Sequence, residues 1–330
     1  MKSIRRILFA VRNPDAARQP ALIKAIGIAK SFGASLELFH ALASPVFTAP
    51  QPMAGESVDS LRSRMVEHAR TRLEKFAALA RKHRVAVECS ATWDYPPHEA
   101  IVRRAKKVEA DLIVAECHRG RHARRWLMQL TDWELLRASE LPVLLLKNAR
   151  SYRRPVVLAA VDPSHAHAKP ARLDADILRA GARLSCTLHG RLHVMFANDP
   201  PLNVFALGDP SINGAALAMS HESLEAEGRE AFQRFMDTMD VDPARRHLVN
   251  QPPALAIPAI ARSTRAGLVV MGAVSRSALQ RLLIGNTAER VLDALPCDVL
   301  VVKPRGTKTR VAATERGMRV VSQPATPLVA

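Results

Sequence analysis

Cysteine and aromatic residues are scarce in this chain. Only four of its 330 residues are cysteines, and no two of them form a CxxC pair. This argues against a zinc ribbon and a disulfide framework, and it favours a role for the cysteines as small buried hydrophobic residues. Aromatic residues make up 4% of the sequence, so we expect no extended stacking surface for single-stranded nucleic acid.

Long apolar runs are also missing. No stretch approaches the roughly 18 apolar residues that a membrane-spanning helix needs. The start of the chain is basic, but the apolar run that follows it, Ile7–Val11, is too short for the core of a signal peptide. We therefore expect a cytoplasmic protein without a membrane span.

Acidic residues are outnumbered by basic ones. The chain has 48 Lys and Arg against 31 Asp and Glu, which gives a net charge of +17. This excess permits attraction to nucleic acid through counterion release. The sequence contains no helix-turn-helix or RNA-binding signature, however, so nucleic acid is an alternative partner that rests on charge alone.

The two halves of the sequence repeat one another. Asp94-Tyr95-Pro96-Pro97 is similar to Asn250-Gln251-Pro252-Pro253, 156 positions later. The same offset aligns Leu112–Val114 with Leu268–Val270 and Leu144–Lys147 with Leu300–Lys303. The repeat predicts two homologous domains, at 1–150 and 151–304. The tail, 305–330, has no sustained apolar period, and we expect it to be disordered.

Apolar strands alternate with amphipathic helices in each half. In the second half we expect strands at 156–161, 192–197, 247–250, 267–272 and 298–302. Helices are expected at about 169–184, 220–239, 253–265 and 287–295. Such alternation implies parallel pairing with right-handed crossovers. The predicted fold is α/β, with two tandem doubly wound parallel five-stranded sheets flanked by helices.

Candidate binding residues in the second half follow two of the expected strands. Asp162 ends the first strand, and Gly272 ends the fourth. Gly285-Asn286-Thr287 then opens a helix, where glycines and backbone N–H groups favour an anion. Arg276 could neutralise phosphate charge. In an open parallel sheet, ligands lie beyond the carboxyl ends of the strands.

The segment from Gly272 to Thr287, with Ala288–Leu292 and the strand Cys297–Val302, resembles the C-terminal signature of universal stress protein domains. The tandem arrangement and the segment Thr131-Asp132-Trp133 are similar to the E type of that family. The resemblance implies a Rossmann-like fold and a site for ATP or a related nucleotide with Mg²⁺.

The resemblance also implies roles for individual residues. Asp162 matches the acidic residue on the adenine side, and the phosphate and ribose loop is matched by Gly272, Ser275, Gly285, Asn286 and Thr287. Two positions depart from the family pattern: Ser275 stands where the family has glycine, and Asn286 separates Gly285 from Thr287. A serine offers its N–H and hydroxyl but restricts the backbone.

The first half differs at the equivalent positions. Arg12-Asn13 replaces the acidic residue, and Glu116-Cys117-His118 stands where the second half has Gly272-Ala273-Val274. We expect this domain to lack the nucleotide site and to pair with the second domain as an intramolecular pseudo-dimer. Homo-oligomers are a further expectation.

We interpret the chain as a cytoplasmic stress-response binding protein, with no metal site. No nucleophile–base pattern stands out, so we do not expect an enzyme, although weak nucleotide hydrolysis stays open. An alternative is a module that binds an apolar ligand or a protein partner and has lost nucleotide binding. The apolar insertions Ser44–Glu56 and Asp199–His221 would then cover the ligand or present a partner surface.

Overall fold

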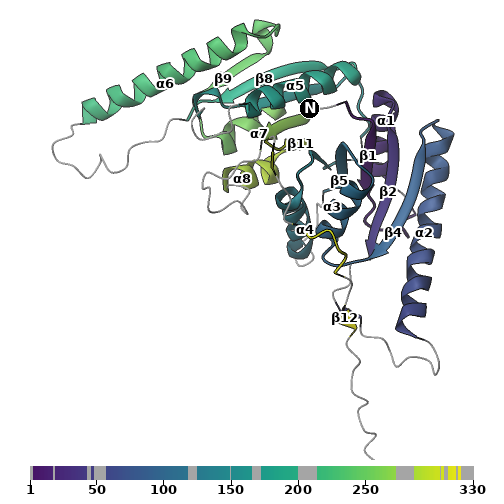
Figure 1. Ribbon diagram of the computed structural model, residues 1–330. Coiled ribbons are helices and arrows are strands. Elements are labelled where there is room, and N and C mark those ends of the chain that lie inside the picture. Colours follow the sequence, from purple (N-terminus) through teal and green to yellow (C-terminus); the bar gives the residue numbers. More distant parts are fainter. Residues whose placement is uncertain are drawn as a thin grey trace, which may run out of the picture. The chain divides into compact units, whose positions relative to one another are not determined.

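The computed structural model divides the chain into two compact units (Figure 1). It describes residues 3–17, 19–42, 46–47, 57–117, 125–148, 150–165, 172–199, 214–272, 286–304, 306–307, 311–316 and 319–320. The first unit contains Lys2–Val143, Ala149–Ser151 and Lys308–Ala330. The second contains Met1, Leu144–Asn148 and Tyr152–Thr307.

The first unit is a parallel sheet with helical crossovers. Its elements are β1 (Arg6–Ala10), α1 (Pro20–Phe32), β2 (Ser35–Leu42), β3 (Val46–Phe47), α2 (Val58–Lys82), β4 (Val87–Trp93), α3 (Pro97–Lys107), β5 (Leu112–Glu116) and α4 (Arg125–Ala138). The strand order is β4-β2-β1-β5. All three pairs are parallel, and the long helix α2 packs along β4 (Figure 1).

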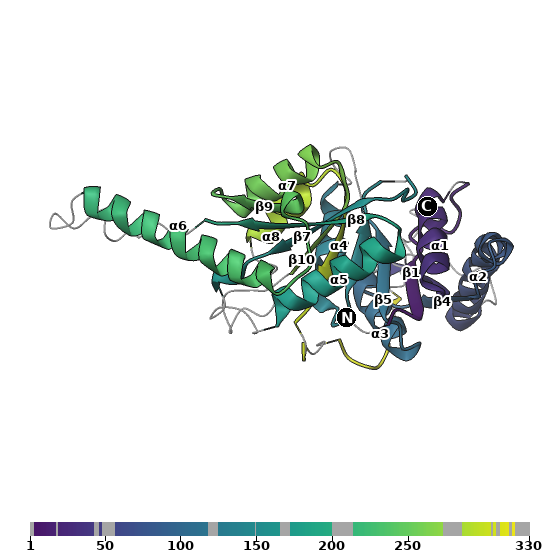
Figure 2. The same cartoon turned by 90° about the horizontal axis from the view of Figure 1, so that it is seen from above.

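The second unit has the same plan. Its elements are β6 (Val143–Leu146, joined to this unit from Leu144), β7 (Val156–Val161), α5 (Leu173–Thr187), β8 (Arg191–Ala197), α6 (Gly214–Asp237), β9 (Arg246–Val249), α7 (Pro253–Ser263), β10 (Ala266–Gly272), α8 (Asn286–Ala294) and β11 (Asp298–Val302). The strand order is β6-β11-β10-β7-β8-β9. In Figures 1 and 2, α6 extends past the edge of this unit's sheet.

Local sequence explains where these elements form. The central strands β1, β7 and β10 are nearly continuous apolar runs, as expected for strands covered on both faces. Helix α1 begins at Pro20, where a missing N–H costs nothing, and it ends at Gly33 in the left-handed region, with φ of 63°. The α/β prediction of two tandem doubly wound parallel sheets is confirmed.

Two helices begin at positions other than those expected from sequence. Helix α5 begins at Leu173, with Asp174 and Asp176 in its first turn, where carboxylates favour the positive end of the helix dipole. Helix α6 begins at Gly214, before the expected position near residue 220. Helix α7 was placed to within two residues, with Pro253 in its first turn.

Part of the C-terminal segment contacts the first unit. Val311–Arg316 lies near Asp94, Glu99 and Arg103, and β12 (Arg319–Val320) pairs in parallel with β3. These contacts fall within 305–330, where the sequence predicts disorder. Among the helices that the structure describes, none is both long and apolar enough to cross a membrane.

Candidate functional site

The carboxyl edge between β7 and β10 is the point in the second unit where the strand order reverses. The chain passes from β7 to β8 and β9 on one side, and then to β10 and β11 on the other. Ala160 pairs with Met271, so the two strands end together, and Asp162 and Gly272 follow at this edge. Ligands of doubly wound sheets lie at such a reversal.

Asp162 takes part in a local hydrogen-bond network. Its backbone N–H donates to Asp174 Oδ1 at 3.0 Å, and the Ser164 hydroxyl donates to its Oδ1 at 3.1 Å. Asp174 belongs to the first turn of α5. The turn after β7 is thereby tied to the start of α5, and the Asp162 carboxylate is held at the strand end.

Gly272 packs closely against α5. A Cβ at this position would lie 2.8 Å from Leu173 Cδ2 and 3.1 Å from Ile177 Cδ1, both on α5. A contact below 3.0 Å forces the neighbour to move, and here that neighbour is the end of the Leu173 side chain. The glycine therefore lets α5 approach β10, whether or not its backbone also approaches a ligand.

The remaining residues of the predicted loop are described only in part. Ser275, Arg276 and Gly285 lie outside the described residues, and so does the loop that joins β10 to α8. Asn286 and Thr287 are the first residues of α8, although their side chains are outside the described part of the chain. Their placement at the start of α8 agrees with the prediction that Gly285-Asn286-Thr287 opens a helix.

The equivalent edge of the first unit, between β1 and β5, holds ionisable side chains. Burial raises the pKa of Asp132 on α4 to about 7, while a hydrogen bond with Cys117 and the charge of Arg12 act in the opposite direction. Burial lowers the pKa of Arg12, and the negative charges of Asp132 and Glu116 oppose this. A guanidinium, two carboxyl groups and a thiol thus stand where the second unit has Asp162 and Gly272.

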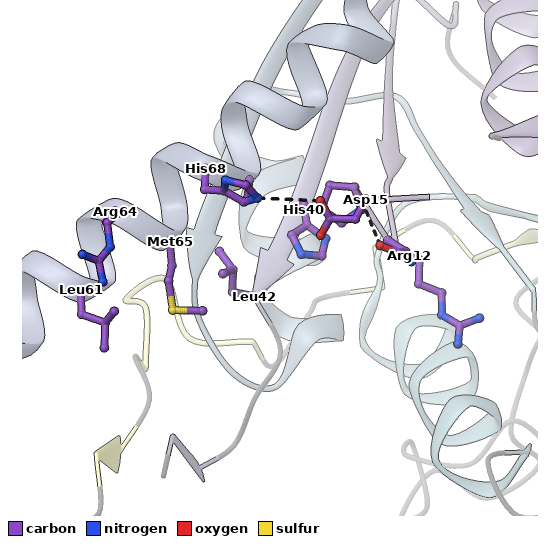
Figure 3. Close-up of a pocket in the computed structure, with 11 residues that line it drawn as sticks. Arg12, Asp15, His40, Leu42, Leu61, Arg64, Met65 and His68 are labelled. Carbon is purple, nitrogen blue, oxygen red and sulfur yellow. Dashed lines mark hydrogen bonds and ion pairs between the residues drawn. The ribbon is translucent and has the colours of Figure 1, made fainter. Parts of the chain in front are cut away.

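A pocket of about 500 Å³ opens beside this edge in the first unit (Figure 3). The loop after β1, the end of β2 and the N-terminal half of α2 form its walls. Its apolar lining is Pro14, Leu42, Leu61, Met65 and Ala69. Its polar lining is Arg12, Asn13, Asp15, His40, Arg64 and His68. We call this cavity the first-unit pocket.

The polar side of the first-unit pocket contains charged groups of both signs. Its lining has two arginines and one carboxylate, and that carboxylate, Asp15, accepts a hydrogen bond from Arg72 Nε at 2.8 Å. His68 Nε2 lies 3.8 Å from Asp15 Oδ1 (Figure 3). Arginine side chains in such a lining can bind an anionic group of a ligand.

His40 is a neutral polar group in the wall of the pocket. Its Nδ1 lies 2.8 Å from the Val11 carbonyl oxygen. Because a carbonyl only accepts, Nδ1 carries the proton, and Nε2 of the neutral ring is an acceptor. Burial lowers the pKa of His40 below the usual 6.5, which keeps the ring neutral at pH 7.

The sequence missed the first-unit pocket. Leu61, Met65 and Ala69 are spaced four residues apart on one face of α2, and such spacing is equally typical of a core-facing helix. Among the described residues, no group of three or more His, Cys, Asp or Glu side chains is arranged to hold a metal ion.

Two consecutive doubly wound units, each with a reversal of strand order at its carboxyl edge, define a tandem α/β protein built from Rossmann-like domains. The chain belongs to the universal stress protein family. The model of that family matches residues 3–147 and matches again at residues 156–303.

Relatives from other bacteria align with nearly the whole chain. Universal stress protein E of Photorhabdus laumondii is 24% identical over 311 residues, which cover 93% of this chain and 98% of the relative. Universal stress protein E of Escherichia coli K12 is 24% identical over 309 residues, covering 92% and 96%. The predicted resemblance to the E type is confirmed.

Solved structures agree on the fold. A functionally unknown protein from Pseudomonas aeruginosa superimposes with a TM-score of 0.69 at 27% identity, covering 92% of this chain and 93% of that protein. A universal stress protein from Archaeoglobus fulgidus gives a TM-score of 0.58 at 17% identity, covering 90% and 96%. The second likeness concerns the fold alone.

Proposed function

We propose that this chain is a stress-response binding protein whose second domain binds ATP or a related nucleotide. The observation that carries the proposal is the position of Asp162 and Gly272 at the strand-order reversal between β7 and β10. The start of α8 at Asn286 supports it, because a helix N-terminus attracts phosphate. Family membership supports the stress-response role.

The individual residues would contact different parts of the nucleotide. Asp162 would meet the adenine side. Gly272, Ser275, Gly285, Asn286 and Thr287 would surround the phosphates and ribose, and Arg276 would neutralise phosphate charge. A Mg²⁺ ion bound with the nucleotide would neutralise further phosphate charge. The role is binding, not catalysis, and the expected location is the cytoplasm.

The test compares substitutions in the two domains. Titration calorimetry with ATP should detect binding to the wild-type chain and none to Asp162→Ala or Gly285→Val. Glu116→Ala, at the equivalent edge of the first domain, is the matched control and should bind like wild type. Equal loss from Glu116→Ala would contradict the assignment to the second domain.

Ser275 tests how far the site departs from the family pattern. A serine where the loop needs glycine costs on the order of 1 kcal/mol, which is several-fold in affinity. Ser275→Gly should therefore tighten ATP binding several-fold. Unchanged affinity would show that the loop accepts serine without strain, and no heat from either protein would reject ATP as the ligand.

The first-unit pocket supports a second candidate function. Its apolar wall on β2 and α2 faces a polar side that includes two arginines. A ligand with an apolar body and an acidic group matches this lining. In this alternative the chain is a non-nucleotide binding module, and the first domain, not the second, holds the ligand.

Mass spectrometry of small molecules released by denaturing the purified protein separates the two candidates. A nucleotide that is released from the wild-type chain but not from Gly285→Val supports nucleotide binding by the second domain. An amphipathic acid that is released from the wild-type chain but not from Met65→Glu supports ligand binding in the first-unit pocket. The substitution places a charge on the apolar wall of that pocket. The position of Met65 on the partly exposed face of α2 makes this change compatible with folding.

The two domains are further proposed to pair within the chain as a pseudo-dimer. The support is the repeat itself, since Leu144–Lys147 and Leu300–Lys303 occupy equivalent positions in the two halves. Higher homo-oligomers would be built from such pairs.

A further inference from the structure

Two buried carboxylates of the first unit hold the C-terminal segment. Asp94 follows β4, and Glu99 lies in the first turn of α3. The backbone N–H of Arg316 donates to Asp94 Oδ1 at 3.0 Å, and Arg316 Nε lies 2.9 Å from Glu99 Oε2. Arg103 Nη1 donates to the carbonyl oxygen of Ala312 at 3.3 Å.

The receiving groups are organised among themselves. Arg103 on α3 donates to Asp94 Oδ2 at 2.6 Å and to Glu99 Oε2 at 3.1 Å. With the C-terminal segment in place, the side chains of Asp94, Arg103 and Glu99 are 1%, 8% and 13% exposed. Groups that hold one another in place in this way bind a partner at little cost in ordering.

Without the C-terminal segment, this cluster has a net negative charge. Asp94 and Glu99 carry two negative charges, and Arg103 carries one positive charge. An excess charge among largely buried groups is costly unless it is paired. Arg316 supplies the second positive charge, while Asp94 Oδ1 accepts its backbone N–H. This complementarity explains why an arginine-bearing extended segment fits here.

The same segment continues toward the first-unit pocket. Glu315 Oε2 lies 3.8 Å from Arg62 Nη2 on α2, and the neighbouring residues Leu61, Arg64 and Met65 line the pocket. Farther along, β12 pairs with β3, which follows the strand that ends in the pocket residue Leu42. The segment therefore contacts α2, which forms one wall of the pocket, and β3, which follows the strand that forms another.

We propose that Asp94, Glu99 and Arg103 form a peptide-binding site whose ligand is the chain's own C-terminal segment Ala312–Arg316. Bound there, the segment restricts entry to the first-unit pocket, and its release opens the pocket. The control of entry rests on the proposed function of that pocket, whereas the peptide site does not.

The attachment is suited to reversible release. The Arg316 side chain is 57% exposed, and Arg62 and Glu315 are 45% and 52% exposed. Ion pairs with such exposure are individually weak and are screened by salt. The β12–β3 ladder adds only two residue pairs. The segment is tethered to the chain, however, so a weak site is filled at high effective concentration.

The first experiment supplies the segment in trans. A chain ending at Thr307 should bind a fluorescein-labelled peptide of residues 308–322 in an anisotropy titration. The intact chain should bind it several-fold more weakly because its site is filled. Peptide Arg316→Ala and receptor Glu99→Gln should each weaken binding, and added salt should do the same. A scrambled peptide of equal charge that binds equally well would overturn the site.

The second experiment measures entry to the pocket with 1-anilinonaphthalene-8-sulfonate, a probe with an apolar body and an acidic group. In stopped-flow mixing, the chain ending at Thr307 should take up the probe several-fold faster than the intact chain. Arg316→Ala should lie between them. The exposed arginine variant Arg229→Ala, on α6 of the second unit, should match wild type.

Met65→Glu makes the outcomes distinguishable. Uptake that Met65→Glu abolishes occurs in the first-unit pocket, and equal rates for the truncated and intact chains would then overturn the control of entry. If the truncated chain shows no uptake that depends on Met65, the pocket fails as a ligand site and the control of entry fails with it. The peptide titration still decides whether Asp94 and Glu99 bind the segment.

Discussion

Asp298 is a fully buried carboxylate at the start of β11. It accepts hydrogen bonds from the Tyr152 hydroxyl at 2.6 Å and from the backbone N–H of Lys147 at 2.8 Å. Its negative charge and burial raise the pKa of Tyr152 well above the usual value, and burial is the larger cause. Lys147 Nζ donates to the carbonyl oxygens of Leu292 and Leu295, near the negative end of α8. These bonds fasten Leu144–Asn148 to the second unit.

Asp298→Ala should lower the free energy of unfolding by roughly 3 kcal/mol, because it leaves buried donors without an acceptor. Tyr152→Phe removes one donor and should cost only about 1 kcal/mol. Urea titration followed by circular dichroism measures both. Asp293→Ala, an exposed aspartate on α8, is the control and should change stability little. A loss for Asp298→Ala no larger than this control would contradict the proposed role.

Asp132 should make the stability of the first unit depend on pH. Burial raises its pKa from the ordinary 3.8 to about 7. Between these values the folded chain holds a proton that the unfolded chain has lost. The free energy of unfolding should therefore fall as the pH rises from about 4 to about 7, by on the order of 4 kcal/mol in total. Above pH 7 it should be level with respect to this group.

Asp132→Asn removes this titration while keeping the shape of the side chain. The wild-type urea midpoint should fall between pH 5 and pH 8, and the variant's midpoint should fall less. Other groups, such as His40 and His98, whose pKa values burial lowers, contribute equally to the pH dependence of both proteins. The difference between the two proteins therefore reports on Asp132. The same pH dependence in both proteins would show that Asp132 does not hold the proton.

At the level of whole elements, the packing of α5 on β10 depends on one glycine. Gly272→Ala should destabilise the second unit by about 1–3 kcal/mol, because its Cβ would overlap Leu173 and Ile177. Gly27, exposed within α1, has nothing within 4 Å of an added Cβ. Gly27→Ala should instead stabilise the chain by about 0.5–1 kcal/mol. Thermal unfolding of the two variants should therefore shift in opposite directions.

At the scale of the whole molecule, the residues between the two repeats decide how the second domain behaves alone. A fragment of residues 151–307 lacks Lys147 and Asn148, which donate to Asp298. It also leaves one edge of β11 open, because the neighbouring strand β6 is missing. We expect this fragment to self-associate at roughly tens of micromolar in sedimentation, a range typical of weak pairing.

The matched fragment begins at Val143 and retains β6 with Lys147 and Asn148. It should be more stable to urea and should self-associate less. A fragment of residues 151–307 that sediments as a stable monomer would show that these residues are dispensable to the second domain.

The sequence by itself determined the repeat, the alternation of strands and helices, and the parallel α/β class. These features follow from local hydrophobic periodicity and from residues such as Pro253 that fix helix starts. The sequence also placed Asp162 and Gly272 at strand ends, because the end of a strand is determined by residues close to it in the sequence. The roles of the loop residues Ser275, Arg276 and Gly285 stay predictions.

Only the tertiary structure decided which distant side chains meet. Met65 and His40 share a pocket because α2 packs against the end of β2, and no local pattern encodes that approach. Arg316 reaches Asp94 across 222 positions of sequence. Composition made residues 305–330 look unsuited to order, since the segment cannot bury a core of its own. For Ala312–Arg316, two carboxylates fixed by Arg103 supply partners that the segment's composition does not reveal, because the site's complementary charge depends on the fold around it.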